Sequence, residues 1–206
     1  MTATQQRQQA IEWSVASQAL PGLSVSGDLH LVAPTPDGVL LAVVDGLGHV
    51  EEASAVARIA VDVIGQHARK PVAAIVQRCH AALQRSRGVV MTIIAVDVLN
   101  DTATALGIGN VETVIVRVSP QARSRCETVL LRCGVVGYQL PTLQTSVIPL
   151  DPGDVIVFAT DGVREDFADL VTTGETPSQI VGKIIAQKFR GTDDGLVLAC
   201  KYLGKP

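Results

Sequence analysis

Short apolar runs of strand length recur along the chain, and helical patterns interrupt them at only two places. Loose alternation over 11–19 and 24–33, followed by a continuous apolar run over 39–44, predicts three strands at the start. Further strands are predicted within 89–99, 102–110, 112–119, 128–136, 145–150, 154–160 and 195–203. The segment APTPDG (33–38) contains two prolines and an Asp-Gly pair, and it predicts a hairpin between the second and third strands.

Two amphipathic helices are predicted after the third strand, and one more before the last strand. The first places apolar residues on one face, and these are Ala53, Val56, Ala57, Ala60, Val61 and Ile64. The second opens at Pro71 and the third at Pro177, a residue type that suits the start of a helix. Because strands and helices do not alternate one by one, the order favours an α+β fold with a largely antiparallel β core. We expect one domain over 1–206.

The composition supports a well-packed globular protein and excludes some classes of partner. Hydrophobic residues make up 47% of the 206 residues and charged residues 18%, which is unlike a disordered chain. Aromatic residues are only 3%, so the core must be aliphatic and surfaces that stack nucleic-acid bases are not expected. The net charge of −3 predicts no general affinity for polyanions. We therefore expect no nucleic-acid partner.

No segment approaches the roughly 20 consecutive apolar residues that a membrane-spanning helix needs, so no membrane association is expected. The four cysteines, Cys79, Cys126, Cys133 and Cys200, include no close pair. This spacing fits reduced thiols in the cytoplasm better than a disulfide framework.

Aspartates at the ends of apolar runs are the main chemical signal. Asp28, Asp45, Asp161 and Asp193 each lie at such an end, beside a glycine or another small residue. An ionised carboxylate near a core is costly unless it is paired or metal-bound, and no matching lysines or arginines adjoin these sites. Hard divalent cations prefer such oxygen ligands. A single Asp-Gly pair is more often a turn, and spacing alone does not show that the four sites converge.

The motifs SGD, VVDGLGH followed by EEASAVA, ATDG and TDDGLVL resemble, in the same order, those of the metal-dependent 2C-type Ser/Thr protein phosphatases. The bacterial branch is most similar, and the 85–112 stretch resembles the RsbX-type stressosome phosphatases. The resemblance implies two stacked antiparallel β-sheets flanked by helices, with the acids at one edge. This agrees with the α+β pattern.

The resemblance also implies two divalent cations, Mn²⁺ or Mg²⁺, and a role for each acid. Asp45 would bridge both ions, and the Gly46 carbonyl would join the second ion's sphere. Asp28 would serve the second ion mostly through water. Asp161 and Asp193 would hold the first ion.

Several residues depart from the family pattern. Asp194, next to the chosen Asp193, is the alternative ligand, and otherwise it belongs to a turn into the last strand. Leu47 stands where many eukaryotic members have a histidine, so His49 becomes a candidate catalytic acid, although a loop-capping role suits it equally. Val50 and Gly195 also differ from the pattern, which bears on rate and substrate fit.

The implied reaction is hydrolysis of a phosphoserine or phosphothreonine ester by a metal-bound hydroxide. The implied substrates are phosphorylated stressosome proteins, of the scaffold and co-antagonist types, whose dephosphorylation resets a stress-response sigma-factor pathway. Two alternatives stay open. One is a phosphatase of an anti-anti-sigma factor in another partner-switching pathway, and the other is a non-catalytic phosphoprotein-binding module with this fold.

Two further segments have alternative interpretations. Residues 107–110 (GIGN) lack the spacing and the helix of a nucleotide loop. The resemblance makes them a turn near the active edge, and an ordinary hairpin turn is the alternative. The stretch 117–132 carries Arg117, Arg123, Arg125 and Arg132 against Glu127 alone. It is either a solvated face or a docking patch for a phosphorylated partner.

Overall fold

The computed structural model describes residues 10–23 and 25–205, and it contains two β-sheets. The first sheet has the strand order β1 (Ile11–Gln18), β11 (Gly195–Tyr202), β10 (Val155–Ala159), β6 (Glu112–Val116) and β7 (Cys126–Thr128). The second has the order β2 (Asp28–Thr35), β3 (Gly38–Gly46), β4 (Val89–Asp97), β5 (Thr102–Ile108) and β8 (Leu131–Arg132), with β9 (Ser146–Pro149) also paired to β5.

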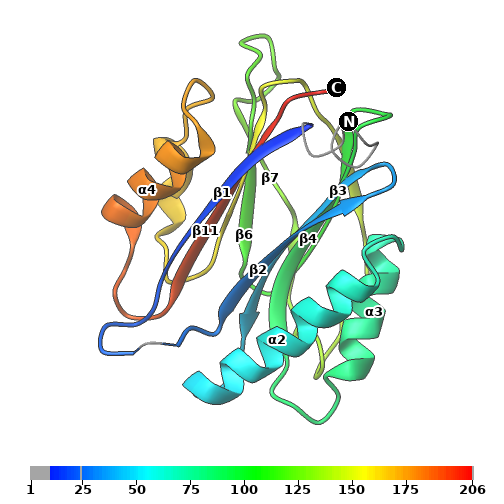
Figure 1. The fold of residues 1–206 in the computed structure, drawn as a ribbon, viewed down its shortest axis with the longest axis vertical. Coiled ribbons are helices and arrows are strands. Elements are labelled where there is room, and N and C mark those ends of the chain that lie inside the picture. The colour runs from blue at the N-terminus through cyan, green and yellow to red at the C-terminus, as the bar shows by residue number, and fades with distance from the viewer. Residues whose placement is uncertain (1–9, 24, 206) are drawn as a thin grey trace.

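Helices cover the outer face of each sheet, as Figure 1 shows. The helices α2 (Val50–Gln66) and α3 (Val72–Ala82) lie on the second sheet, whereas α4 (Pro177–Lys188) lies on the first, beside β1 and β11. A 3-10 helix, η1 (Glu165–Leu170), adjoins α4. All three predicted helices are confirmed, and the α+β fold of two stacked sheets is confirmed with them.

The core has three parts, and their arrangement explains the apolar run at 39–44. Alternate side chains of β3 point to opposite faces of the sheet. Leu41 and Val43 pack between the two sheets, whereas Leu40, Ala42 and Val44 pack under α2 and α3. Because both faces of β3 are covered, the strand is apolar throughout instead of alternating. A third cluster packs beneath α4.

Two strand predictions were wrong in detail. Residues 128–136 do not form one strand, because the chain crosses between the sheets there: β7 pairs with β6, and β8 pairs with β5. Val129, at the crossing, is buried between the sheets, so its apolar character does not indicate a strand. The strand predicted over 24–33 begins at Asp28, and residue 24 lies outside the described residues. The hairpin at 33–38 is confirmed, with Thr35 opposite Gly38.

Over residues 10–23 and 25–205, we find no helix whose length and apolar character would suffice to cross a membrane.

Candidate metal centre

Asp28 and Asp45 lie directly opposite one another across the β2–β3 pair. Opposite residues of an antiparallel pair have Cβ atoms about 4.5–5.5 Å apart, so two carboxylates of like charge share one face of the sheet edge. Asp28 is 5% exposed and Asp45 is half-buried. The hairpin register therefore fixes a close pair of acids from residues far apart in the sequence.

The glycine after Asp45 is required by packing and not by a hairpin turn. A Cβ atom at Gly46 would lie 2.0 Å from the carbonyl oxygen of Ala53 in α2, so only glycine lets the helix approach the strand end. Gly162, after Asp161, is constrained in the same way by the carbonyl oxygen of Asp194, at 1.8 Å. The two Asp-Gly pairs thus mark places where backbone comes close to the acidic edge.

Acids from both sheets line one cavity of about 190 Å³ between the strand ends. Asp161 follows the end of β10, and Asp193 and Asp194 directly precede β11, its neighbour in the first sheet. The second sheet contributes the paired Asp28 and Asp45. The cavity is lined by Asp28, Asp45, Gly46, Asp161, Asp193 and Asp194, among others. The fold brings every acid singled out in the sequence to one place.

Thr160 connects Asp28 to the first sheet. Its hydroxyl donates a hydrogen bond of 2.7 Å to Oδ2 of Asp28 and accepts one of 2.8 Å from the backbone N–H of Leu196. Thr160 is 2% exposed, so this connection is shielded from water. The contact orients the Asp28 carboxylate and ties the two sheets together at the cavity. Thr160 was not recognised in the sequence, where it reads as one more β-branched residue at a strand end.

The adjacent acids Asp193 and Asp194 differ in what they contact. The carboxylate of Asp194 accepts hydrogen bonds from the backbone N–H groups of Leu20, at 2.8 Å, and Gly27, at 2.7 Å. It therefore fastens the β1–β2 connection to the start of β11. Asp193 is exposed, and its Oδ1 accepts only the N–H of its neighbour, at 2.8 Å, among the described residues. Asp193 is the acid of the two whose oxygens remain available to a ligand.

Asn110 is a further polar residue of the cavity. Its amide Nδ2 donates a hydrogen bond of 2.7 Å to Oδ2 of Asp161. Gly109, before it, has a φ of +91°, which turns the chain sharply after β5. Residues 107–110 are therefore a strand end and turn at the acidic edge. The glycine-asparagine pair was the available signal for this contact.

Burial and mutual repulsion perturb the acids. Burial raises the pKa of Asp45 to about 8, with a further rise from the charge of Asp28. Burial likewise raises the pKa of Asp28 to about 7, although its hydrogen bond from Thr160 opposes the rise. The pKa of Asp161 is raised by burial and by Asp193. In the part of the chain that the structure describes, no lysine or arginine forms an ion pair with the five carboxylates.

This donor set fits hard divalent cations. The polar side chains that line the cavity present carboxylate or amide groups, and the acids outnumber the nearby cations, of which Arg190 acts on Asp161 without forming an ion pair. Among residues 10–23 and 25–205, no three acidic, histidine or cysteine side chains gather closely enough to ligate one ion together. Mg²⁺ keeps several waters and typically needs only one or two carboxylates, so the acids fit an ion of this kind.

His49 occupies the N-cap position of α2, where it is exposed and makes no side-chain capping hydrogen bond. Leu47, Gly48 and Val50, but not His49, line the acidic cavity. The residue therefore lies at the rim of the site.

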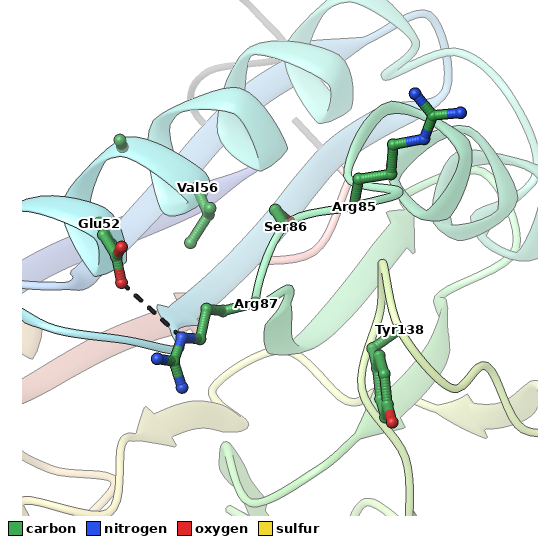
Figure 2. Close-up of a pocket in the computed structure, with 7 residues that line it drawn as sticks. Glu52, Val56, Arg85, Ser86, Arg87 and Tyr138 are labelled. Carbon is green, nitrogen blue, oxygen red and sulfur yellow. Dashed lines mark ion pairs between the residues drawn. The ribbon is translucent and has the colours of Figure 1, made fainter.

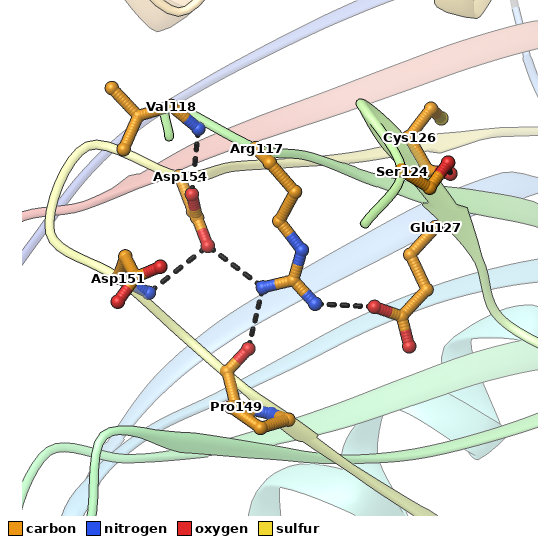
Figure 3. A network of polar contacts seen from close by, with 8 residues as sticks. All are labelled: Arg117, Val118, Ser124, Cys126, Glu127, Pro149, Asp151 and Asp154. Atoms are coloured by element: carbon orange, nitrogen blue, oxygen red, sulfur yellow. Dashed lines mark hydrogen bonds and ion pairs between the residues drawn. The ribbon is translucent and has the colours of Figure 1, made fainter. Parts of the chain in front are cut away.

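The arginine-rich stretch lies at the other end of the first sheet. Glu112, the first residue of β6, is opposite Ala159 near the acids, whereas Arg117 follows the far end of the strand. Figure 3 shows Arg117 between Asp154, at 2.9 Å, and Glu127, while its guanidinium also donates to the Pro149 carbonyl. The guanidinium of Arg125 donates to the Val171 carbonyl, at 3.0 Å. These two arginines have structural partners.

The fold and sequence have clear relatives. Phosphoserine phosphatase RsbX of Bacillus subtilis (strain 168) is 23% identical over 174 residues, which cover 84% of this chain and 85% of RsbX. The crystal structure of RsbX in complex with magnesium matches with a TM-score of 0.84 at 21% identity, covering 93% of this chain and 95% of that one.

Two further structures extend the comparison. One structure has a TM-score of 0.84 at 28% identity, and the match covers 93% of this chain and 99% of that chain. It comes from work on "The bacterial stressosome: a modular system that has been adapted to control secondary messenger signaling". The catalytic domain of the serine/threonine phosphatase PstP in complex with two manganese ions has a TM-score of 0.68 at 12% identity, covering 94% and 98%.

The two stacked sheets share the fold of the PP2C phosphatase domains among the solved structures. The chain belongs to the Stage II sporulation protein E (SpoIIE) family, whose family model matches residues 35–201.

Proposed function

We propose that this protein is a metal-dependent phosphatase that hydrolyses phosphoserine or phosphothreonine in a partner protein. The observation that carries the proposal is the single cavity in which both sheets place their strand-end aspartates. A cluster of acids in a cleft, several of them with raised pKa values and none in an ion pair among the described residues, is typical of a functional site and costly to a purely structural one. Membership of the SpoIIE family supports the same reaction.

We assign the ligands as follows. Asp45 would serve both ions, and Asp28 and the Gly46 carbonyl would serve the second of them. Asp161 and Asp193 would serve the first, with water completing the coordination, because no three such side chains among the described residues gather around one point. Bound Mn²⁺ or Mg²⁺ supplies Lewis-acid chemistry and an activated water at neutral pH. The assignment of Asp193 is supported by its free oxygens, since the oxygens of Asp194 already accept two backbone N–H groups.

The chain's own residues prepare the site in defined ways. Thr160 holds the carboxylate of Asp28, and Asn110 holds that of Asp161, so neither acid has to be ordered when a ligand binds. α2 begins shortly after the Asp45-containing strand, and its first turn carries Glu51 and Glu52. His49 is proposed as a proton donor to the leaving group, which its exposed position at the rim permits.

The substrates we propose are phosphorylated stressosome proteins of the scaffold and co-antagonist types. Their dephosphorylation would reset a stress-response sigma-factor pathway. The proposal is supported by the similarity to RsbX and to the structure described with the bacterial stressosome. We further propose that the described strands and helices form one phosphatase domain that works in the cytoplasm, where the four free thiols would stay reduced.

The decisive experiment measures hydrolysis of a small aryl phosphate with Mn²⁺, and again after addition of a chelator. We expect turnover that the chelator abolishes and that Asp193→Asn removes. The matched variant Asp194→Asn should instead lower the thermal stability, because two backbone N–H groups lose their charged acceptor.

Retention of activity in the chelator would contradict the proposal. Binding of a phosphoprotein without any turnover would identify a non-catalytic binding module. Phosphorylated scaffold and anti-anti-sigma proteins, compared as substrates, separate the two pathways.

A further inference from the structure

A second and larger cavity, of about 720 Å³, adjoins the acidic one. Its walls come from three segments that are distant in the sequence: the first turns of α2, the loop between α3 and β4, and the turn around 138. Figure 2 shows the loop with both arginines lying between α2 and Tyr138. The residues that line this cavity include Glu52, Val56, Arg85, Ser86, Arg87 and Tyr138.

The loop between α3 and β4 is held in a fixed and strained shape. The hydroxyl of Ser86 donates to the Leu83 carbonyl, at 2.6 Å, and accepts from the Gly88 N–H, at 3.0 Å. Arg85 has a φ of +73°, which is unfavourable for a residue with a side chain. Strain of this kind is retained where the surrounding structure enforces it, and it is concentrated at functional sites.

The two guanidinium groups of this loop are available to a ligand. Arg85 has no ion-pair partner among the described residues. Arg87 approaches Glu52 at 3.7 Å, but the two side chains are 65% and 60% exposed, and such surface pairs are weak. Tyr138 is 77% exposed. Arginine and exposed tyrosine beside an apolar wall are the residues that most often anchor a protein partner.

Gly48 lies between the two cavities. This glycine lines the acidic cavity, and a Cβ atom built on it would lie 3.1 Å from Oε2 of Glu52 and 3.6 Å from Cγ of Arg87. The Leu47 N–H also donates to the Gly88 carbonyl, at 3.0 Å, so the arginine loop is bonded to the acidic edge. A peptide whose phosphorylated residue lies at the acids would therefore come close to Arg87 and its loop where it passes Gly48.

We propose that the cavity around Arg85, Arg87 and Tyr138 binds an acidic segment next to the phosphorylated residue of the protein substrate. The proposal rests on the phosphatase function and names the chemistry of its substrate. Arginine binds carboxylates in a two-pronged, charge-assisted geometry, so Arg85, which has no ion-pair partner among the described residues, and the weakly paired Arg87 favour glutamate- or aspartate-rich sequence. The acidic cavity alone repels such a segment, and the arginines offset that repulsion at the place where the chain leaves it.

The test compares two phosphoserine peptides that differ only in their flanks, which are glutamates in one and alanines in the other. Non-hydrolysable phosphonate versions are labelled for binding by fluorescence anisotropy. The variant is Arg85→Glu with Arg87→Glu. The matched control is Arg58→Glu with Arg78→Glu, which changes the charge equally at exposed positions of α2 and α3 outside the cavity.

We expect the variant to weaken binding of the glutamate-flanked peptide about tenfold relative to the alanine-flanked one, whereas the control leaves this ratio within about twofold. The ratio of kcat/KM values for the two phosphoserine peptides should fall in parallel. An unchanged ratio, or an equal change in the control, overturns the proposal. If the parent protein binds the glutamate-flanked peptide preferentially but hydrolyses neither peptide, the phosphatase function is refuted and the docking site for an acidic segment is retained. If it hydrolyses both peptides without preference, the docking site is refuted and the phosphatase function is retained.

Discussion

Asp45 lies directly opposite Asp28 at the end of the β2–β3 hairpin, and the two carboxylates face the same cavity. Placing like charges opposite one another destabilises a sheet. The Asp28–Asp45 pair therefore lowers the stability of the metal-free protein, and this cost is consistent with a role of the pair in binding a ligand. At Asp45, activity and stability should therefore change in opposite directions.

Asp45→Asn should lower Mn²⁺-dependent hydrolysis of an aryl phosphate by on the order of 100-fold or more, because metal stabilisation of the transition state is large. The same variant should raise the free energy of unfolding of the metal-free protein at pH 8 by about 1 kcal/mol, since a buried charge and its repulsion are removed. Asp37→Asn, in the turn of the same hairpin, should change neither quantity. Full activity in Asp45→Asn would refute the metal assignment.

The metal-free protein should lose stability as the pH rises. Asp28 and Asp45 have pKa values raised from 3.8 to about 7 and about 8 in the folded state. Between pH 4 and 8 the folded state therefore binds more protons than the unfolded state, and the free energy of unfolding decreases with increasing pH. Urea unfolding in a chelator at pH 5, 6.5 and 8 measures this slope. The slope should become much smaller when both residues are changed to asparagine, and an unaltered slope would mean that other groups cause the pH dependence.

Thr160→Val should lower the free energy of unfolding by about 1–3 kcal/mol, because Asp28 and the Leu196 N–H both lose a buried partner. Thr160→Ser should restore most of the loss, since it keeps the hydroxyl. The chain offers a matched control in Thr113, which is fully buried and whose hydroxyl lacks a partner within the described residues. Thr113→Val should be neutral or stabilising in the same denaturant titration. Equal losses at both positions would show that the bridge to Asp28 is unimportant.

Gly162→Ala should destabilise the protein by about 1–3 kcal/mol and reduce activity, because the new methyl group would collide with the backbone of Asp194 and displace the acids. Gly182, in α4, has no atom within 4 Å of a Cβ position. Gly182→Ala should therefore stabilise the helix by up to about 1 kcal/mol. Thermal unfolding of the two variants provides the comparison, and a neutral Gly162→Ala would disprove the close approach.

Arg117→Ala should cost about 3–5 kcal/mol, because it leaves the fully buried Asp154 without its cation. The activity of each folded molecule should be unaffected, since Arg117 lies at the end of β6 remote from the acids. Arg164→Ala removes an exposed ion pair with Asp166, at 3.6 Å, and an exposed hydrogen bond to the Gln187 carbonyl, at 3.3 Å, and should cost less than about 1 kcal/mol. A loss of specific activity in folded Arg117→Ala would instead favour the alternative in which residues 117–132 form a docking patch for a phosphorylated partner.

Much of this architecture follows from local patterns in the sequence. Periodicity identified α2, α3 and α4, and the Pro- and Asp-Gly-containing segment fixed the β2–β3 hairpin, because these signals depend on neighbouring residues only. The division of 128–136 between two sheets escaped detection, since an apolar residue buried at a crossing looks the same as one in a strand.

The sequence by itself determined which residues are the candidate metal ligands: aspartates at the ends of apolar runs, in the order of a known motif series. Only the tertiary structure decided that they meet, because strand register places Asp28 opposite Asp45 and sheet stacking brings Asp161 and Asp193 beside them. It also separated Asp193 from Asp194 through the backbone groups that Asp194 binds, and it revealed the arginine cavity beside Gly48. These features depend on contacts between residues distant in the chain, which no local pattern specifies.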